Sequence, residues 1–543
     1  MHALNTPRMP ESTSKEESMK NENAKREMKI EIDASNPDYL LVNGNKIYVD
    51  EELRVPILEQ YAEAPKDCGI SQFASISRLP GLHLAVGLPD FHKGYALPIG
   101  SVAAIDLSDP AACVSPDGVG FDINCGVRCL KTNLTSKSLP TNLRNKLGDM
   151  LIQEVPLASK EDRKYNNINN VSLEDLNMIL DSGMKHLLEM GIANEDDIEC
   201  TESNGSLPGN SKLVGQYAKS RGIAQMGTLG EGNHYLEIQV VEKIFDDDLA
   251  NKMGIFEDQI LVSIHTGSRG VGHGCCEEIL KEIKSQASGR MNKDEVKAAY
   301  KKIAGNLELS KREKKEAYAE LKDSINQKMK EAKEEMSSLM AIPYDSTLGK
   351  KYVSVMFSAS NYAWANRSFI THKARKCFRK LFPHASLEMV YDVCHNIAKI
   401  EKDQDGKELI VHRKGASRVL PPFHPDLPQR YQEIGQPVLV GGSMGTFSYL
   451  IVGAAGCSKT CFSTCHGAGR LVTRSQSRQQ FDYKQIVNTL NEKDIVFRSG
   501  SKEGMIEECS ECYKDVNAVV DHSQKMGITK TVCRVRPVLV IKG

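Results

Sequence analysis

The 543-residue chain has none of the long apolar runs that membrane proteins need. No stretch of about 20 apolar residues occurs in it, so we expect no membrane-spanning helix. The N-terminus also lacks the apolar core of a secretory signal peptide, because it is polar and carries mixed charge. Residues 1–28 therefore predict a disordered polar tail, residues 29–543 predict the folded part, and we expect the protein in the cytoplasm, the nucleus or both.

The chain also lacks an excess of positive charge. Its 70 Lys and Arg residues balance 71 Asp and Glu residues, which gives a net charge of −1. A protein that binds nucleic acid through its overall charge is excluded. Any binding of nucleic acid must come from a local basic groove.

The cysteines do not indicate a disulfide framework or a complete zinc site. There are 15 of them, an odd number in a long chain without a secretory signal, which favours a reducing compartment. Cys509 and Cys512 form a CxxC pair, but no second CxxC exists to complete a zinc site. We interpret the cysteines mainly as ordinary buried thiols.

The common nucleotide-binding motifs are missing as well. No GxxxxGK[ST] loop and no dinucleotide fingerprint after a clear strand is found, so P-loop ATPase and dehydrogenase chemistry are not supported. The loop GGSMGTFSY does place Ser443 and Ser448 among glycines. Such a loop either contacts a ribose or phosphate, or is a tight turn between strands.

The distribution of polar and apolar residues predicts one domain with an inserted arm. Residues 277–340 are dense in Lys, Glu and Ala with apolar residues at helical spacing, which indicates long, exposed, charged helices. Functional polar residues are scattered from about residue 90 to residue 542. A site assembled from the whole chain favours a single mixed α+β domain over several domains.

Four glycine-rich, strand-like segments carry side chains that can bind metal ions. The segments are VGFDINCGVR, GEGNHYLEI, LVSIHTGSRGVGH and MVYDVCHNI. Their candidate ligands are Asp122, Cys125, His234, His265 and His395. This mixture of oxygen, sulfur and nitrogen fits Mn, Zn, Fe or Co without choosing between them, and a bridging Cys favours a binuclear site. The alternative is that each His is a hydrogen-bonded structural residue.

Other basic residues have open roles. His92, His273 and His412 lie near these motifs and can support the site or bind substrate, but we do not expect them to be ligands. The cluster HKARKCFRK, residues 372–380, looks helical. It either lines an RNA groove or forms a solvated face.

The segment STCHGAGRLVTRSQSR is the strongest candidate for covalent chemistry. His466 precedes two glycines that allow a phosphate to approach the backbone closely. Arg470, Arg474 and Arg478 follow at intervals of four, which on a helix is one basic face. His466 can attack phosphorus and form a phosphoramidate. The alternative is a helix N-terminus that only binds an anion.

Together these segments resemble RtcB-type RNA-splicing ligases, from about residue 30 to the C-terminus. The motifs that carry the resemblance, in order, are GLPDFHKGYALPIGSV, DGVGFDINCGVR, GEGNHYLEIQ, HTGSRGVGH, VYDVCHNIAK, HRKGASR and CHGAGR. The resemblance implies a single mixed α/β domain with a central active-site cleft. It also implies a GTP- and Mn²⁺-dependent ligase that joins a 3′-phosphate or 2′,3′-cyclic phosphate to a 5′-hydroxyl through a histidine–GMP intermediate.

The same resemblance assigns roles to individual residues. It implies that His466 takes GMP from GTP, and that two Mn²⁺ ions are held by Asp122, Cys125, His234, His265 and His395. The implied guanylate contacts are Asn233, Glu237, Ser443, Ser448, Tyr513 and Lys542, and the implied phosphate contacts are Arg269, Arg470 and Arg474. The implied partners are RNA, with tRNA halves as the default, an archease-type activator and a multi-subunit tRNA ligase complex. A non-catalytic RNA-binding scaffold and a metal-dependent phosphoesterase are the competing hypotheses.

Overall fold

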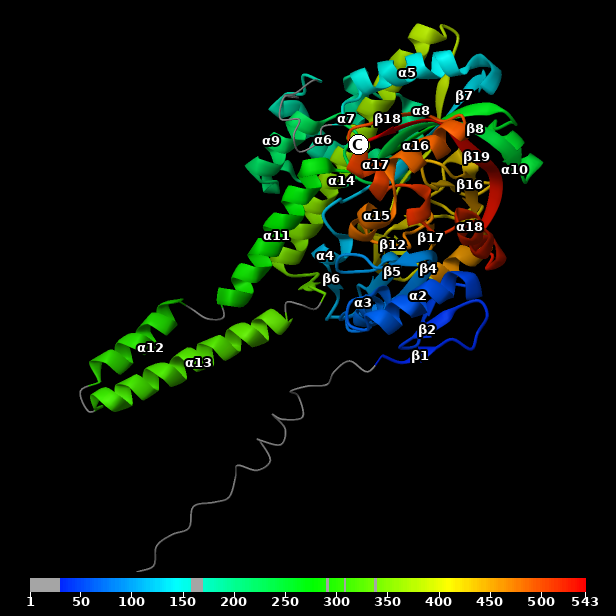
Figure 1. The fold of residues 1–543 in the computed structure, drawn as a ribbon. Helices are drawn as coiled ribbons and strands as arrows, with labels where there is room; N and C mark the ends of the chain where they lie inside the picture. Colours follow the sequence, from blue (N-terminus) through cyan, green and yellow to red (C-terminus); the bar gives the residue numbers. More distant parts are fainter. Residues whose placement is uncertain (1–29, 158–168, 290–292, 307–308, 336–338) are drawn as a thin grey trace, which may run out of the picture.

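A computed structural model describes residues 30–157, 169–289, 293–306, 309–335 and 339–543 of the chain. The tail predicted for residues 1–28 lies outside these described residues. Two β-sheets form the body, helices cover them, and a helical arm extends from one side (Figure 1). Within the described ranges, no helix has both the length and the apolar character needed to cross a membrane.

The first sheet combines the N-terminal strands with a hairpin from the middle of the chain. Its spatial order is β1-β2-β3-β4-β5-β13-β12. The strands are β1 (Ile32–Asp33), β2 (Leu40–Val42), β3 (Asn45–Ile47), β4 (Leu82–His92), β5 (Ile99–Asp106), β12 (Asn396–Lys402) and β13 (Glu408–Lys414). All neighbours are antiparallel except β3 and β4. The pairing of β5 with β13 brings two distant parts of the sequence together.

The second sheet has the order β11-β7-β9-β8-β19-β16-β15, with β18 pairing parallel to β19. The strands are β7 (Gly126–Thr135), β8 (Tyr235–Ile244), β9 (Gln259–Thr266), β11 (Leu387–Cys394), β15 (Pro437–Val440), β16 (Ser448–Gly453), β18 (Val496–Ser499) and β19 (Thr529–Lys542). Every residue of β9 is buried. Because β19 pairs with β8, β16 and β18, the C-terminal end of the chain enters the protein interior.

Two small sheets and a set of helices complete the body. The small sheets pair β6 (Cys113–Val114) with β10 (Ile342–Pro343), and β14 (Ala416–Arg418) with β17 (Ser463–Cys465). The helices are α2 (Glu51–Glu63), α3 (Gly69–Ile76), α4 (Pro116–Val119), α5 (Thr141–Glu154), α6 (Leu173–Ser182), α7 (Met184–Glu189), α8 (Glu195–Glu199), α9 (Gln216–Gln225), α10 (Asp247–Met253), α14 (Thr347–Leu381), α15 (Arg474–Gln480), α16 (Tyr483–Glu492), α17 (Lys502–Glu507) and α18 (Val516–Lys525). Short 3₁₀ turns include η2 (Glu202–Gly205), η5 (Ala455–Thr460) and η6 (Ser510–Cys512).

The 35-residue helix α14 is fixed to the second sheet by a buried ionic cluster. Arg128 of β7 and Arg367 of α14 both donate to Asp392 of β11, at 2.7 and 2.8 Å, and all three side chains are fully buried. Arg367 also donates to the backbone carbonyls of Asn124 and Thr266, each at 2.9 Å. A buried charge needs such complete pairing to be tolerated. The cluster therefore fixes the loop before β7 and the end of β9, where candidate ligands lie.

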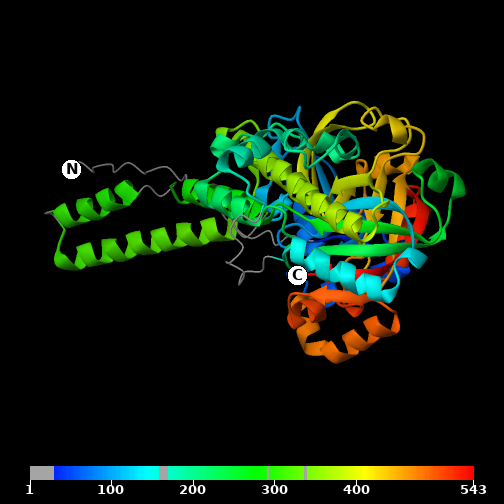
Figure 2. The ribbon, with the colours of Figure 1, turned by 90° about the horizontal axis from the view of Figure 1, so that it is seen from above.

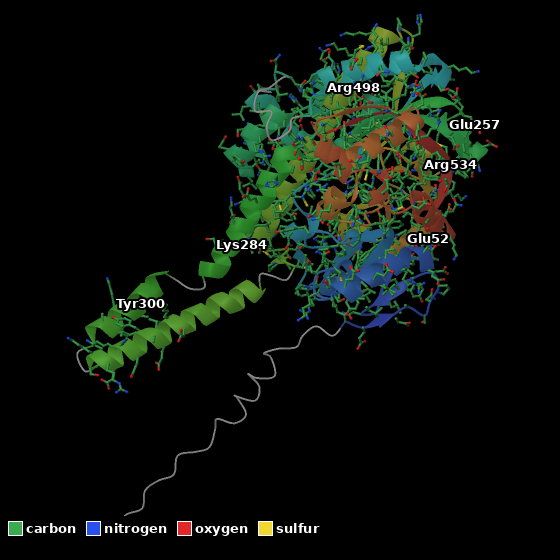
Figure 3. All side chains as sticks on the ribbon, viewed as in Figure 1. Glu52, Glu257, Lys284, Tyr300, Arg498 and Arg534 are labelled. Carbon is green, nitrogen blue, oxygen red and sulfur yellow. The ribbon has the colours of Figure 1, made fainter. Side chains whose placement is uncertain are left out.

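The helical arm consists of α11 (Arg269–Gly289), α12 (Lys293–Gly305) and α13 (Lys311–Glu335). The first half of α11 is anchored by buried apolar residues and packs against α9 and α14. Beyond it, α12 and α13 lie side by side and extend away from the body in both views (Figures 1 and 2). The rings of Tyr300 and Tyr318 stack between them at 5.6 Å, and Figure 3 shows Tyr300 far from the densely packed body.

This architecture confirms the predicted α+β class and single domain with an inserted helical arm. The charged helices expected over residues 277–340 are α12, α13 and the second half of α11. However, α11 begins at Arg269, eight residues before 277. Its first turns follow directly from the HTGSRGVGH motif, so the arm is a continuation of a helix that belongs to the body.

Candidate active site

Strand register brings the predicted metal ligands together from four parts of the sequence. His265 near the end of β9 pairs with Val127 of β7 on one side and with Tyr235 of β8 on the other. The loop before β7 carries Asp122 and Cys125, and His234 directly precedes β8. His395 directly follows β11, whose last residue pairs with the first residue of β7. Adjacent strand ends therefore present all five side chains at one place.

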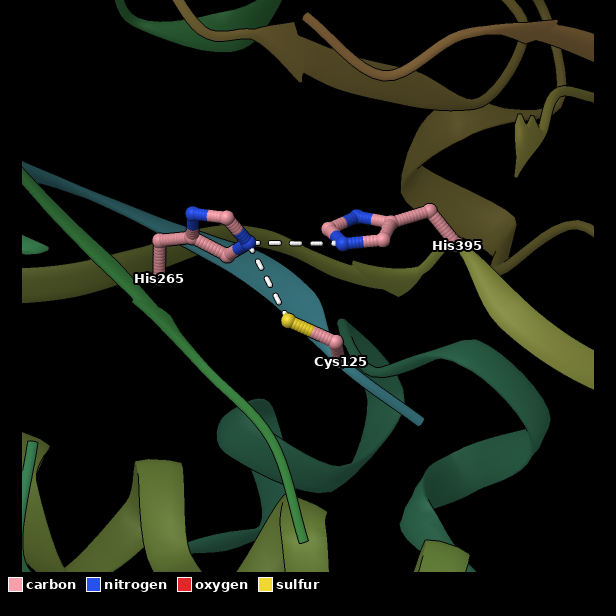
Figure 4. A group of neighbouring side chains, drawn as sticks. All are labelled: Cys125, His265 and His395. Atoms are coloured by element: carbon pink, nitrogen blue, oxygen red, sulfur yellow. Dashed lines mark hydrogen bonds between the residues drawn. The ribbon is translucent and has the colours of Figure 1, made fainter. Parts of the chain in front are cut away.

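The ligand atoms form two groups that share Cys125. In the first group, Cys125 Sγ lies 3.2 Å from His265 Nε2, which lies 3.3 Å from His395 Nε2 (Figure 4). In the second group, His234 Nε2 lies 3.3 Å from Cys125 Sγ and 2.9 Å from Asp122 Oδ2. Because Cys125 belongs to both groups, it would be a ligand common to both if two ions bind here.

The chemistry of these donors fits divalent cations. His265 Nδ1 lies 3.0 Å from the carbonyl of Asn233, and donation to that oxygen leaves the Nε2 lone pair facing the cluster. Burial lowers the pKa of His265 and of His395 well below the usual value, so both rings are neutral. Burial raises the pKa of the Cys125 thiol, and a bound cation is what would deprotonate it. Neutral imidazoles, a thiolate and a carboxylate together suit borderline ions such as Mn, Fe, Co or Zn.

Asp122, whose side chain is half-buried, stays ionised. Burial raises the pKa of its carboxyl, but the neighbouring His234 and Arg269 outweigh this effect, and the resulting pKa lies below the usual value. The carboxylate is therefore available as a hard oxygen ligand. It adds negative charge to the second ligand group.

His466 lies beside this cluster and is oriented by a buried aspartate. It follows β17, and its ring centroid is 4.6 Å from that of His395. Its Nδ1 lies 2.7 Å from Asp90 Oδ2, and its backbone N–H donates to the same oxygen at 3.0 Å. Asp90, on β4, is fully buried. A carboxylate that accepts Nδ1–H leaves Nε2 with its lone pair, which is the form that attacks an electrophile.

Asp90 was missed in the sequence analysis. It lies within the motif GLPDFHKGYALPIG, where His92 drew attention instead. His92 Nδ1 lies 2.8 Å from the carbonyl of Asp90, and burial lowers the pKa of His92 to about 3, which makes it a neutral structural residue. The only signal in the sequence was an acidic residue inside a glycine-rich motif. Its pairing with a residue 376 positions later depends on the fold.

A cavity of about 870 Å³ opens next to His466. The predicted site residues that line it are Asn233, Glu237, His265, Ser443, His466, Arg470, Arg474, Tyr513 and Lys542. Ser448 does not line it: its hydroxyl lies behind the loop and accepts a hydrogen bond from Gly442 N–H at 3.0 Å. Arg269 also lies elsewhere, at the start of α11, where its Nε is 3.4 Å from the Thr228 hydroxyl. The cavity therefore gathers most of the predicted nucleotide contacts and two of the three predicted phosphate contacts.

Paired strands place Glu237 and Lys542 on the same cavity wall. Glu237 of β8 pairs in register with Val540 of β19, two residues before Lys542. Burial raises the pKa of Glu237 to about 7, although Lys542 opposes the shift. Burial likewise lowers the pKa of Lys542, against the attraction of Glu508 and Glu237. The wall thus holds a carboxyl group whose charge changes near neutral pH.

The prediction that Arg470, Arg474 and Arg478 lie on one face of a helix is wrong in one respect. Helix α15 begins at Arg474, so Arg470 lies before the helix, in a segment that bridges to Tyr513. Arg470 and Arg474 both contact Glu508, at 3.3 and 3.4 Å, and Arg478 pairs with Glu507. The expected stripe is therefore split, and each arginine is already paired with an acid.

Glu508 is a second residue that the sequence did not reveal. It is fully buried at the end of the cavity, accepts a hydrogen bond from the Tyr513 hydroxyl, and lies 3.8 Å from Lys542 Nζ. Burial raises the pKa of Glu508, but Lys542, Arg474 and Arg470 outweigh this effect, and the resulting pKa lies below the usual value. Glu508 is thus an anion that organises three cations and a tyrosine.

The remaining candidates lie outside the cavity. His412 accepts from Ser115 N–H at 3.0 Å and is structural. His273 stacks on Phe121 at 4.9 Å. The basic cluster at residues 372–380 forms the end of α14, where Arg375 pairs with Asp197 at 2.6 Å and borders a separate cavity of about 440 Å³. Among the described cysteines, all are free and buried, including Cys509 and Cys512.

Comparison with known proteins settles the family. Residues 72–543 match the family described as "tRNA-splicing ligase RtcB". The chain is 39% identical over 487 residues to the tRNA-splicing ligase RtcB of Aeropyrum pernix, covering 88% of this chain and 92% of that one. It is 38% identical over 487 residues to the RNA-splicing ligase RtcB homolog 1 of Entamoeba dispar, covering 87% of this chain and 82% of that one.

The chain belongs to the RtcB family. This confirms the resemblance inferred from the seven sequence motifs, and it makes the protein an enzyme of an RNA ligase family. The donor cluster lies within the matched residues, as does most of the cavity lining, and the rest of the lining comes from residues 56–68.

Proposed function

We propose that this RtcB-family protein joins RNA ends, one with a 3′-phosphate or 2′,3′-cyclic phosphate and the other with a 5′-hydroxyl. We propose GTP and two Mn²⁺ ions as cofactors and a GMP adduct on His466 as the intermediate. We propose tRNA halves as the substrates, because the Aeropyrum pernix relative is named a tRNA-splicing ligase. The observation that carries the proposal is the position of His466. It is oriented by Asp90 between a two-group donor cluster and a nucleotide-sized cavity.

The first step is transfer of GMP to the histidine. His466 Nε2 attacks the α-phosphorus of GTP, an N–P bond forms, the bond to the β-phosphate oxygen breaks, and pyrophosphate leaves. The ring keeps its Nδ1 proton and gains positive charge. Asp90, which lies 2.7 Å from Nδ1 and is fully buried, stabilises that charge and holds the ring in its attacking orientation.

The cavity wall supplies contacts for the nucleotide. An ionised Glu237 can accept hydrogen bonds from the N–H groups of guanine, and Tyr513 offers an aromatic face. Ser443, whose hydroxyl bonds to Ser510 at 2.8 Å, is held in the GGSMG loop for a ribose or phosphate contact. Lys542 and Arg470 contribute positive charge near the phosphates.

The two ligand groups would hold the two ions, with Cys125 shared between them. Bound cations would neutralise the negative charge that builds up on the phosphate oxygens. Around them, Arg367 holds the backbone of the loop before β7 and the end of β9. The residues of the chain thus keep the donors in place.

The later steps use the same centre. An oxygen of the RNA 3′-phosphate attacks the phosphorus of the adduct, which frees His466 and leaves the RNA end capped with GMP. The 5′-hydroxyl of the other RNA then attacks the 3′-phosphate phosphorus, loses its proton, and GMP departs as a stabilised leaving group. A cyclic phosphate is first opened by water to the 3′-phosphate.

We also propose that an archease-type activator assists guanylylation and that the protein works within a multi-subunit tRNA ligase complex, in the cytoplasm, the nucleus or both. These proposals rest on family membership. Omitting the activator from an otherwise complete reaction tests the first, and purification of the protein with its partners tests the second.

A joining assay with defined RNA ends tests the proposed function. Purified protein is mixed with a 3′-phosphate RNA and a labelled 5′-hydroxyl RNA, and GTP or Mn²⁺ is omitted in parallel. A joined product that requires both supports the proposal. Release of phosphate without joining and without GTP use would instead identify a phosphoesterase, and RNA binding without any reaction would identify a scaffold.

A further inference from the structure

Three aromatic rings form a continuous row beside the donor cluster. Tyr95 lies at the cavity mouth and its side chain is 67% exposed. Its ring centroid is 5.5 Å from that of Phe121, with an interplanar angle of 57°. The Phe121 ring in turn stacks on His273 at 4.9 Å, with an angle of 28°. The row leads from the cavity outward to α11.

The three rings come from separate parts of the chain. Tyr95 lies in the loop between β4 and β5, Phe121 directly precedes the candidate ligand Asp122, and His273 lies in the early part of α11. Tyr95 and His273 are exposed, and Phe121 is half-buried. Exposed aromatic surface is costly unless something covers it, and this surface adjoins the place where RNA ends would react.

Among the residues that the structure describes, the two other most exposed aromatic rings do not share this setting. Phe423 is 74% exposed and Tyr217 is 60% exposed, with Arg221 lying over the Tyr217 ring at 5.7 Å. Neither lines the cavity of about 870 Å³. The row at Tyr95 is distinguished by three neighbouring rings and by its contact with the cavity.

We propose that Tyr95, Phe121 and His273 form a stacking platform for an unpaired nucleobase of the RNA, next to the end that reacts at the Asp122–Cys125 cluster. The inference rests on the proposed function, because it assumes an RNA end in this cavity. Bases of single-stranded RNA are commonly bound on aromatic side chains, and such stacking tolerates any base sequence. A ligase that joins ends within varied RNAs needs that tolerance.

The guanine of GTP is the less suitable occupant. The polar groups suited to guanine are Glu237 on β8, Tyr513 directly after η6, and Lys542 on β19. The platform instead adjoins Asp122, on the side of the donor cluster. A base held there leaves its own phosphate or hydroxyl end free to reach the ions.

RNA binding by Tyr95 variants tests the platform. Short single-stranded RNAs, one ending in a 3′-phosphate and one beginning with a 5′-hydroxyl, are titrated into wild type, Tyr95→Ala and Tyr95→Phe. We expect Tyr95→Ala to weaken binding of at least one strand about ten-fold, within the range typical of base stacking, and Tyr95→Phe to bind like wild type. Tyr217→Ala serves as the matched control, and thermal unfolding checks that Tyr95→Ala is folded.

Abasic RNAs identify the base as the contact. Removing the base nearest the end from the affected strand should weaken its binding to wild type and abolish the difference between wild type and Tyr95→Ala. Equal binding of both intact strands by wild type and Tyr95→Ala would overturn the platform, as would a difference that persists with the abasic RNAs. GMP labelling of Tyr95→Ala is measured in parallel, and its loss would assign Tyr95 to GTP and overturn the platform. Because the readout is RNA binding, absence of ligation in wild type would reject the proposed function separately.

Discussion

The cavity together with the adjoining donor cluster has two ends, and they differ in how their charges are satisfied. At one end, Cys125 Sγ lies 3.3 Å from His234 Nε2 and 3.2 Å from His265 Nε2. At the other end, the carboxylate of Glu508 contacts Arg470 and Arg474, so opposite charges are already matched. The first end is rich in electron-pair donors, and at the second end the positive and negative charges are paired.

This difference separates what the fold provides from what a cofactor must provide. The Glu508 end is held by ion pairs and hydrogen bonds within the chain and is organised before any ligand binds. The Cys125 end gathers groups that reach their full bonding capacity only around cations. Removal of divalent ions should therefore disturb the donor cluster and leave the Glu508 network intact.

We expect the largest effect on the difference between the two ends from Cys125→Ala. Because Cys125 belongs to both ligand groups, its loss should lower affinity for both ions by more than about 100-fold, exceeding the usual effect of removing an outer partner. Metal content after dialysis and the rate of RNA joining measure this. Cys129→Ala, on the strand β7 that directly follows Cys125 and equally buried, is the control and should keep its metal. Wild-type metal affinity in Cys125→Ala would contradict the shared-ligand arrangement.

Asp90→Asn should have the next largest effect. The amide keeps the shape of the side chain but can donate to Nδ1, which favours the wrong tautomer of His466. We expect the rate of GMP labelling to fall by about 10²- to 10⁴-fold, with unchanged metal content. Asp106→Asn, in the neighbouring strand β5, should label normally. If metal content fell together with labelling, Asp90 would belong to the donor cluster instead.

Glu237→Gln should change the pH dependence of GTP binding. Because the pKa of Glu237 is raised to about 7, the wild type gains the carboxylate only as pH rises through that value. GTP affinity should therefore increase up to about ten-fold per pH unit below 7 and then level off, whereas the variant should bind weakly at every pH. Calorimetric titration at several pH values measures this. If GTP affinity changed with pH in the same way in both proteins, Glu237 would not be the group that controls GTP binding.

The raised pKa of Glu237 also predicts that the stability of the folded protein depends on pH. This dependence runs in the direction opposite to that of GTP affinity. Between about pH 4.5 and pH 7, folded Glu237 retains a proton that the unfolded chain has released. The stability of the wild type relative to Glu237→Gln should therefore fall as pH rises through this window. Urea unfolding at pH 5 and at pH 8 measures the difference, and a difference independent of pH would exclude the raised pKa.

We expect the smallest effects from substitutions of Arg474 and Arg478, which lie on the exposed side of the Glu508 end. Arg474 and Arg478 are both about half exposed and paired with acids, so either Ala variant should change the free energy of unfolding by no more than about 1 kcal/mol. Arg474 lines the cavity and Arg478 does not. We expect Arg474→Ala to weaken GTP or RNA binding several-fold and Arg478→Ala to leave both unchanged. Equal losses would indicate a general charge effect.

The sequence identified candidate ligand residues better than it identified the residues whose role depends on distant contacts. Cys125, His265 and His395 were found because each lies in a distinctive glycine-rich motif, and strand register then brings them together. Asp90 and Glu508 were missed because their importance comes from contacts with residues far along the chain. Burial and pairing arise only in the folded protein, and no local pattern encodes them.

Two predicted arrangements show the same limit. Four-residue spacing suggested one helix carrying Arg470, Arg474 and Arg478, but α15 begins only at Arg474, where Thr473 caps it by accepting from Gln476 N–H. Ser448 was expected at the nucleotide and instead bonds the backbone of its own loop. In both cases the residue type was informative, and the direction of its side chain depended on packing.

The most direct test of the account is the covalent step itself. Wild type and His466→Ala are incubated with Mn²⁺ and GTP labelled on the α-phosphate, with and without an archease, and the label is treated with acid and alkali. We predict label on wild type that acid removes and alkali spares, as expected for a phosphoramidate, and none on His466→Ala. No label on folded, metal-loaded wild type, or equal label on the variant, would contradict His466 as the nucleophile.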